Sequence, residues 1–310
     1  MKNHVTGLHH ITAMASDPRR NVEFYTRVLG LRFVKKSVNQ DDPGTYHLYY
    51  GDYAANPGTI LTFFPWPGLR RGRPGIGQAY ATGFSVPRGS LTFWSRRLAD
   101  LAIEHFPVEQ RFGAGALVLL DPDGLRLELI EADSDPRPAT PSEVVPAEHA
   151  IRGFHSSTLA LAESGATAEL MTGTMGYRLL ATEGTRRRFE AGAGGPGTWV
   201  DLVVDPKLPR GLNGAGTIHH VAFRVPDESA QIEAHQTIAG LGLHVSPIID
   251  RAYFKSIYYR EPAGILFEIA TDGPGFAIDE AVEHLGETLS LPPRLEAHRA
   301  AIEAALPALS

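Results

Sequence analysis

The feature that most constrains this chain is a short strand-like motif that recurs along it. The stretches "GLHHITAMASD" (7–17) and "TIHHVAFRVPD" (217–227) align when Asp17 is placed on Asp227, and two adjacent histidines then coincide. Each aspartate suits the N-cap of a helix that follows the motif. Such internal similarity predicts a fold built from repeated units.

Two further copies of the motif have lost the histidine pair. In "GFHSSTLALAES" the paired positions hold His155 and Ser156, and in "QAYATGFSVP" they hold Tyr80 and Ala81. Two copies also end alike, in "DPDGLRLELIEAD" and "EPAGILFEIATD", each with one glutamate inside a strand-like stretch. The predicted unit is one strand, one helix and three strands, and it occurs four times.

Such a unit cannot close a core alone, so the units should pair into curled sheets, which gives an α+β fold with two domains. The proline-rich run "DSDPRPATPSEVVPAEH" has neither helical nor strand periodicity and is typical of a linker. The expected division is a domain of two units over 1–133, a linker over 134–149, a second domain of two units over 150–276, and a helical tail over 277–310.

Side-chain alternation along three strands assigns a possible metal ligand of each strand to the concave face. Successive strand residues point to opposite faces, and the more apolar face should lie under the helix. By this criterion His10, His220 and Glu268 all point into the cup, and Glu268 does so from an otherwise apolar strand. A buried carboxylate without a partner is costly, so Glu268 should have one.

A metal ion would provide that partner. The chain contains no cysteine, so only nitrogen and oxygen ligands are available. Two imidazoles and one carboxylate form the facial set that leaves positions on Fe(II) open for substrate and dioxygen. The equivalent residues of the diverged copies, Ala81, Ser156 and Glu128, cannot hold a transition metal. One metal per chain is therefore predicted.

Several stretches in combination carry a family resemblance. "LHHIT", "IHHVAF", "YYREPAGILFEIATD" and "LPPRLEAHRAAIEAALP" resemble the vicinal oxygen chelate superfamily, and within it the hydroquinone 1,2-dioxygenase type of ring-cleaving dioxygenase. The resemblance implies two glyoxalase-like curled-sheet domains and a mononuclear Fe(II) enzyme that cleaves an aromatic diol with O2. It implies metal ligands at His10, His220 and Glu268, the set that alternation selects.

The resemblance also implies residues that orient the hydroquinone and exchange protons with its hydroxyls: His9, Thr12, His219, Arg251 and Tyr258. Either histidine would be a suitable base near neutral pH, while Arg251 and Tyr258 would stabilise the oxyanion. Alternation, however, places His9 and His219 on the helix side, and they reach substrate only if the strand starts are bulged. Tyr258 faces Glu268 only if the hairpin pairs these two residues.

Two other functions are compatible with the same features. Glyoxalase-like metal-dependent isomerases or lyases share the fold, but they usually bring four protein ligands, and the sequence shows three. A metal-free small-molecule binding protein of the superfamily would leave the convergence of the three ligand residues unexplained. The site would also accept Mn or another divalent ion, and the ring substituents of the substrate are not fixed by the sequence.

Charge and hydropathy exclude other partners. The net charge is −6, and no stretch is apolar enough for a spanning helix, so neither nucleic acid nor a membrane is expected as a partner. The histidines at 9 and 10 stand where a signal peptide needs an apolar stretch, which favours a cytoplasmic location. Exposed sheet edges in such a fold are compatible with a homo-oligomer.

Overall fold

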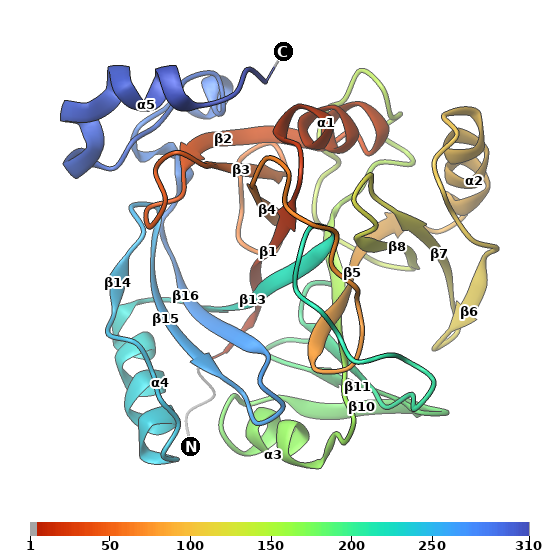
Figure 1. The fold of residues 1–310 in the computed structure, drawn as a ribbon. Helices are drawn as coiled ribbons and strands as arrows, with labels where there is room; N and C mark the ends of the chain where they lie inside the picture. The colour runs from red at the N-terminus through yellow and green to blue at the C-terminus, as the bar shows by residue number, and fades with distance from the viewer. Residues whose placement is uncertain (1–4, 310) are drawn as a thin grey trace.

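The computed structural model describes residues 5–309, and the predicted unit occurs in it four times (Figure 1). The first unit comprises β1 (Gly7–Ala15), α1 (Pro18–Glu23), the π-helical turn η1 (Phe24–Val28), β2 (Arg32–Val38), β3 (Tyr46–Gly51) and β4 (Ile60–Pro65). The second comprises β5 (Gln78–Pro87), α2 (Leu91–Asp100), β6 (Glu109–Arg111), β7 (Ala114–Leu120) and β8 (Arg126–Ala132).

The second half of the chain repeats this order and adds a tail. The third unit comprises β9 (Gly153–Ala160), α3 (Gly165–Gly173), β10 (Arg178–Glu183), β11 (Arg186–Glu190) and β12 (Trp199–Val203). The fourth comprises β13 (Thr217–Val225), α4 (Glu228–Gly240), β14 (Ile249–Asp250), β15 (Phe254–Arg260) and β16 (Leu266–Pro274). The tail holds short 3-10 helices, η2 (Phe276–Ile278), η3 (Val282–His284) and η4 (Pro293–His298), and then α5 (Arg299–Ala305).

The units pair across the chain rather than along it. One eight-stranded sheet has the order β14-β15-β16-β13-β1-β4-β3-β2, and the other has the order β10-β11-β12-β9-β5-β8-β7-β6. Units one and four therefore share a sheet through β1 and β13, and units two and three share the other through β5 and β9. The two units within 1–133 therefore lie in different sheets, and so do the two units within 150–276, so the expected pairing of units inside each segment is wrong. The free edge of each first strand is satisfied by a strand from the other half of the chain.

Local sequence signals account for how two of the helices begin. The Asp17 side chain accepts a hydrogen bond from the Arg20 N–H over 2.9 Å, and Pro18 occupies the first helical position. The Asp227 side chain accepts in the same way from the Ala230 N–H over 2.9 Å. The predicted N-caps are thus confirmed at equivalent points of units one and four.

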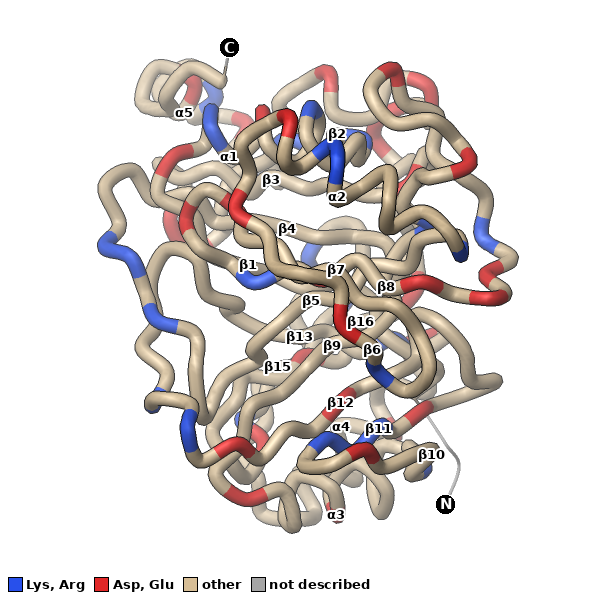
Figure 2. Tube along the Cα trace, turned by 90° about the vertical axis from the view of Figure 1, so that its right-hand side faces the viewer, with Lys and Arg blue, Asp and Glu red and all other residues tan. Residues whose placement is uncertain are grey.

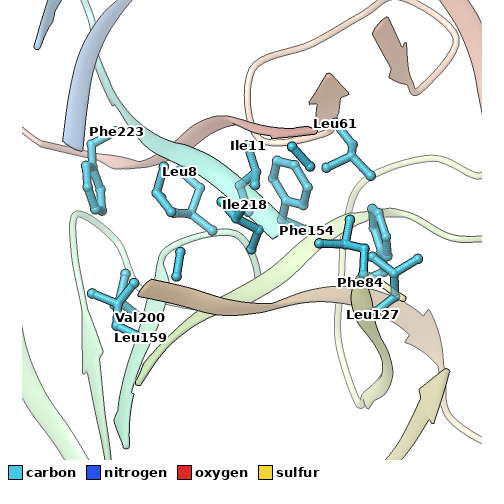
Figure 3. Packing of buried hydrophobic residues seen from close by; sticks show 14 of the residues in the cluster. Leu8, Ile11, Leu61, Phe84, Leu127, Phe154, Leu159, Val200, Ile218 and Phe223 are labelled. Atoms are coloured by element: carbon cyan, nitrogen blue, oxygen red, sulfur yellow. The ribbon is translucent and has the colours of Figure 1, made fainter. Parts of the chain in front are cut away.

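The two sheets share one apolar core. Leu8, Ile11 and Phe223 of the first sheet belong to the same buried cluster as Phe84 and Phe154 of the second, and Figure 3 shows part of this cluster. Apart from His9 and His219, the residues that alternation assigns to the helix side are buried in this cluster: Ile11, Ala13, Ala15, Val221, Phe223, Val225, Ile265, Phe267 and Ile269. Burying these faces leaves the polar faces of β1, β13 and β16 for the concave side of the first sheet.

The tail is fixed to the first sheet by an unusual buried cation. The ammonium group of Lys35 on β2 is fully buried and lies 2.6 Å from Asp279 and 2.5 Å from Glu280. Since a buried charge is stable only when it is paired, this contact fixes the start of the tail against β2. Within residues 5–309, no helix is both long and apolar enough to cross a membrane.

Candidate metal centre and cavity

Two β-bulges shape the strand starts that carry the histidine pairs. In the antiparallel pairing of β1 with β13, the register skips His9 on β1 and His219 on β13. Each is the extra residue of a bulge, and a bulge re-aims the side chains next to it. The second sheet has two equivalent bulges, since the pairing of β5 with β9 skips Tyr80 and His155.

Three side chains converge at the centre of the first sheet. Nε2 of His220 lies 2.9 Å from Oε2 of Glu268, and Nε2 of His10 lies 3.3 Å from the same oxygen. The two Nε2 atoms are 3.3 Å apart, and all three residues are buried. Neighbouring ligands of an octahedral ion with bonds of about 2.1 Å are about 3 Å apart, so these separations fit a metal ion.

The carboxylate of Glu268 supports this assignment. Its Oε1 accepts a hydrogen bond from the Ser256 hydroxyl, whereas its buried Oε2 has no polar neighbour except the two imidazoles. Burial raises the pKa of Glu268, but His10 and His220 outweigh burial and hold it well below the usual range. Glu268 is therefore an anion with one oxygen free for a cation.

The outer histidine of each pair hydrogen-bonds to the inner one. Nδ1 of His9 lies 2.9 Å from Nδ1 of His10, and Nδ1 of His219 lies 2.8 Å from Nδ1 of His220. Such a contact needs one N–H and one lone pair. Burial, followed by the influence of His10, lowers the pKa of His9 well below its usual value, so His9 is neutral and can accept. When the inner histidines donate from Nδ1, their Nε2 lone pairs are free for a metal.

A cavity of about 560 Å³ opens in front of these ligands and is large enough for a small organic molecule. His10 and His220 form part of its lining, together with aromatic side chains and residues of the tail. The aromatic residues in the lining are Tyr49, Phe64, Trp66, Tyr253, Phe254 and Tyr258. The tail contributes Ile278, Asp279, Leu291, Pro292 and Pro293. The cavity thus joins a candidate metal centre to a largely aromatic wall.

Arg251 and Tyr258 lie together on one wall of the cavity. Tyr258 pairs with Glu268 across β15 and β16, the register on which its predicted position depended. Nε of Arg251 donates to the Tyr258 hydroxyl over 3.2 Å. Burial and the nearby Glu268 raise the pKa of Tyr258, so its hydroxyl stays protonated and can donate to a ligand. His219 also borders the cavity.

His9 and Thr12 lie behind the cavity wall. Neither residue is part of its lining, and both are buried. His9 contacts His10 and the Phe254 ring, while the Thr12 hydroxyl lies 2.8 Å from that of Thr62. These two residues can therefore act on a ligand only through their neighbours.

Two residues of the cavity lining, His47 and Tyr49, are not among the site residues predicted from the sequence. Both point to the concave side of β3, because Tyr46, Leu48 and Tyr50 alternate with them into the core. The alternation of residues within "YHLYYG" is the sequence signal that predicts their position on this face.

The second sheet lacks a comparable centre. Among residues 5–309, the group of His10, His220 and Glu268 is the only one whose three ligand atoms converge. Glu128 pairs with Gly83 on β5 just as Glu268 pairs with Ala222 on β13. It meets arginines instead of histidines there.

The fold and this centre define a class of proteins. The chain belongs to the glyoxalase/bleomycin resistance protein/dioxygenase superfamily, whose family model matches residues 7–129 and 153–269. It is 45% identical over 307 residues to a Bacillus subtilis (strain 168) protein named "Putative ring-cleaving dioxygenase MhqO", with 99% of this chain and 97% of that protein covered. It is also 36% identical over 302 residues to a Sphingobium indicum protein named chlorohydroquinone/hydroquinone 1,2-dioxygenase, with 94% and 93% covered.

Solved structures agree with the fold. A crystal structure described as a "putative dioxygenase" from Bacillus subtilis superposes with a TM-score of 0.95 at 43% identity, covering 100% of this chain and 99% of that one. Glyoxalase I from Zea mays superposes with a TM-score of 0.64 at 14% identity, covering 86% and 92%. At that identity the maize enzyme supports the shared fold alone.

Proposed function

We propose that this protein is an Fe(II)-dependent ring-cleaving dioxygenase that acts on hydroquinone-type aromatic diols with O2. The observation that carries the proposal is a buried facial set of His10, His220 and Glu268 at the end of an aromatic-lined cavity. Three protein ligands leave positions open for a diol and dioxygen. The names of the relatives at 36% and 45% identity support the same chemistry.

The three ligands would hold the metal, and the cavity would hold the ring. When bound, Fe(II) would provide the site at which electrons pass from the diol to dioxygen. The aromatic walls would stack on the substrate ring and exclude water from it. Because Glu268 is anionic and both imidazoles are neutral when they act as ligands, the set carries one negative charge toward a divalent cation.

Residues at the cavity surface would exchange protons with the substrate and stabilise the charge that develops on it. His219 is exposed to the cavity, and its Nδ1 is engaged by His220, so its Nε2 remains to exchange a proton with a substrate hydroxyl. Tyr258 would donate a hydrogen bond to the developing oxyanion, and Arg251 would orient the Tyr258 hydroxyl and add positive charge. His9 and Thr12 would act from behind the wall, with His9 fixing the orientation and tautomer of His10.

Oxygen uptake by the anaerobically Fe(II)-loaded protein tests this proposal. Hydroquinones and catechols are offered in turn, with His220→Ala as the control variant and bound iron measured in both proteins. Uptake with a hydroquinone that disappears in the variant is the expected result. One bound iron per chain without uptake from any diol would overturn the proposal in favour of an oxygen-independent isomerase.

A further inference from the structure

The two walls of the cavity are related by the internal repeat. Glu268 pairs with Ala222 on β13 and with Tyr258 on β15. In the first unit, Thr62 pairs with Thr12 on β1 and with Tyr49 on β3. Since Ala222 follows His220 by two residues and Thr12 follows His10 by two, the register makes Tyr49 the counterpart of Tyr258.

The hydroxyls of both tyrosines are held by a nitrogen-bearing side chain. Tyr258 accepts from Nε of Arg251 over 3.2 Å, whereas the Tyr49 hydroxyl lies 2.7 Å from Nδ1 of His47. Nε2 of His47 lies 2.9 Å from the Thr62 hydroxyl, which in turn lies 2.8 Å from that of Thr12. A chain of hydrogen bonds therefore runs from the Tyr49 wall to the strand that carries His10.

This second wall is polar but uncharged. Burial, followed by His10 and His220, lowers the pKa of His47 well below its usual value. Burial, followed by Tyr253, raises the pKa of Tyr49 well above its usual value. The His47 ring is also held between two aromatic rings, 4.1 Å from Tyr49 and 4.4 Å from Phe64 between centroids. Both groups are thus fixed hydrogen-bonding partners for a neutral ligand group.

We propose that Tyr49, oriented by His47, binds the hydroxyl of the diol that is not at the metal. This inference rests on the proposed function, because it assigns the second hydroxyl of the same substrate. The wall of Tyr258 and Arg251 serves the metal-bound end, and its counterpart on β3 serves the other end. The repeat therefore supplies one tyrosine for each hydroxyl of a ligand that itself has two equivalent ends.

Competitive binding of two ligands of similar shape tests the inference. Hydroquinone and 4-methylphenol are titrated anaerobically into the Fe(II)-loaded protein, and the dissociation constant of 4-methylphenol divided by that of hydroquinone is compared between variants. Tyr49→Phe should lower the preference for hydroquinone by about 3- to 10-fold, the worth of one hydrogen bond. Tyr50→Phe is the matched control, because that hydroxyl donates to Asn21 in the core over 2.8 Å.

Each outcome separates the inference from the proposed function. An unchanged ratio in a folded Tyr49→Phe protein would overturn the inference, even if the wild type consumes oxygen. A lowered ratio would support it, even if no diol is cleaved. His47→Phe keeps an aromatic ring between its neighbours and should lower the ratio in the same direction, so it replaces Tyr49→Phe if that variant does not fold.

Discussion

At the scale of single residues, Tyr258 offers the most direct test of the proposed chemistry. Tyr258→Phe removes only the hydroxyl that lies beside Arg251 and should lower kcat by about 10- to 100-fold. Metal content should stay at the wild-type value, because Tyr258 is not among the converging ligands. Oxygen-uptake kinetics and metal analysis of the same sample provide the two measurements.

The neighbouring residue provides the control for that substitution. Tyr259 points into the core, where its hydroxyl lies 3.4 Å from the Met175 sulfur, so Tyr259→Phe should leave kcat unchanged. Equal activity of Tyr258→Phe and the wild type would remove Tyr258 from the mechanism.

Alternation could predict the three converging residues but not the side chain of His219, which is itself the extra residue of a bulge. It placed His10, His220 and Glu268 on one face, and these residues converge in the structure. It was wrong for His219, which borders the cavity, because a bulge adds one residue and breaks the two-residue period. No sequence pattern marks where a strand is bulged, so the contact of His9 with His10 could not be derived.

At the scale of elements, the second sheet shows what replaces the histidines. Glu128 on β8 is buried and lies 2.6 Å from Arg111 and 3.3 Å from Arg126. Asp201 on β12 is buried against Arg186 and Arg188, and Figure 2 shows basic and acidic positions close together around β11 and β12. Guanidinium groups thus neutralise the carboxylates in the second sheet, where no metal is expected.

Removing one of these arginines should destabilise the protein. Arg111→Met leaves buried Glu128 with only the weaker influence of Arg186 and Arg126 and should lower the free energy of unfolding by about 3 kcal/mol near neutral pH. Urea denaturation measures this change.

The double variant Arg111→Met/Glu128→Met should recover most of the lost stability, since an apolar pair can replace a buried ion pair. If the single variant were as stable as the wild type, Arg111 would not be the main partner of Glu128.

At the scale of the whole molecule, Asp121 connects units that belong to different sheets. It lies between β7 and β8, and its Oδ2 accepts a hydrogen bond from the hydroxyl of Tyr25 in η1 over 3.0 Å. The Leu125 N–H donates to Oδ1 over 2.8 Å. Burial raises the pKa of Asp121 from 3.8 to about 6. The contribution of Asp121 to the stability of the protein therefore depends on pH.

The sign of that dependence follows from linkage. A carboxyl whose pKa is raised on folding stabilises the protein fully below pH 3.8 and loses that contribution as pH rises through about 6. Relative to Asp121→Asn, the wild type should gain about 2–3 kcal/mol of unfolding free energy between about pH 7 and pH 4. Urea titrations of both proteins at several pH values measure the difference, and parallel curves would contradict it.

The repeats predicted how many units there are but not which units share a sheet. Similar first strands can pair in several combinations, and each combination buries a similar apolar face. The choice depends on long-range contacts such as that between Arg73 and Leu212, whose loops meet where the chain passes between the sheets. Such contacts leave no periodic signal in the sequence.

The pairing of the first unit with the last has a consequence for biosynthesis. The second sheet uses one continuous stretch of chain, from β5 to β12, and can close while the ribosome is still translating β13 to β16. One edge of β1 stays unpaired until β13 has been synthesised, and Glu268 on β16 is synthesised later still. The candidate metal centre is therefore among the last parts of the protein to be assembled.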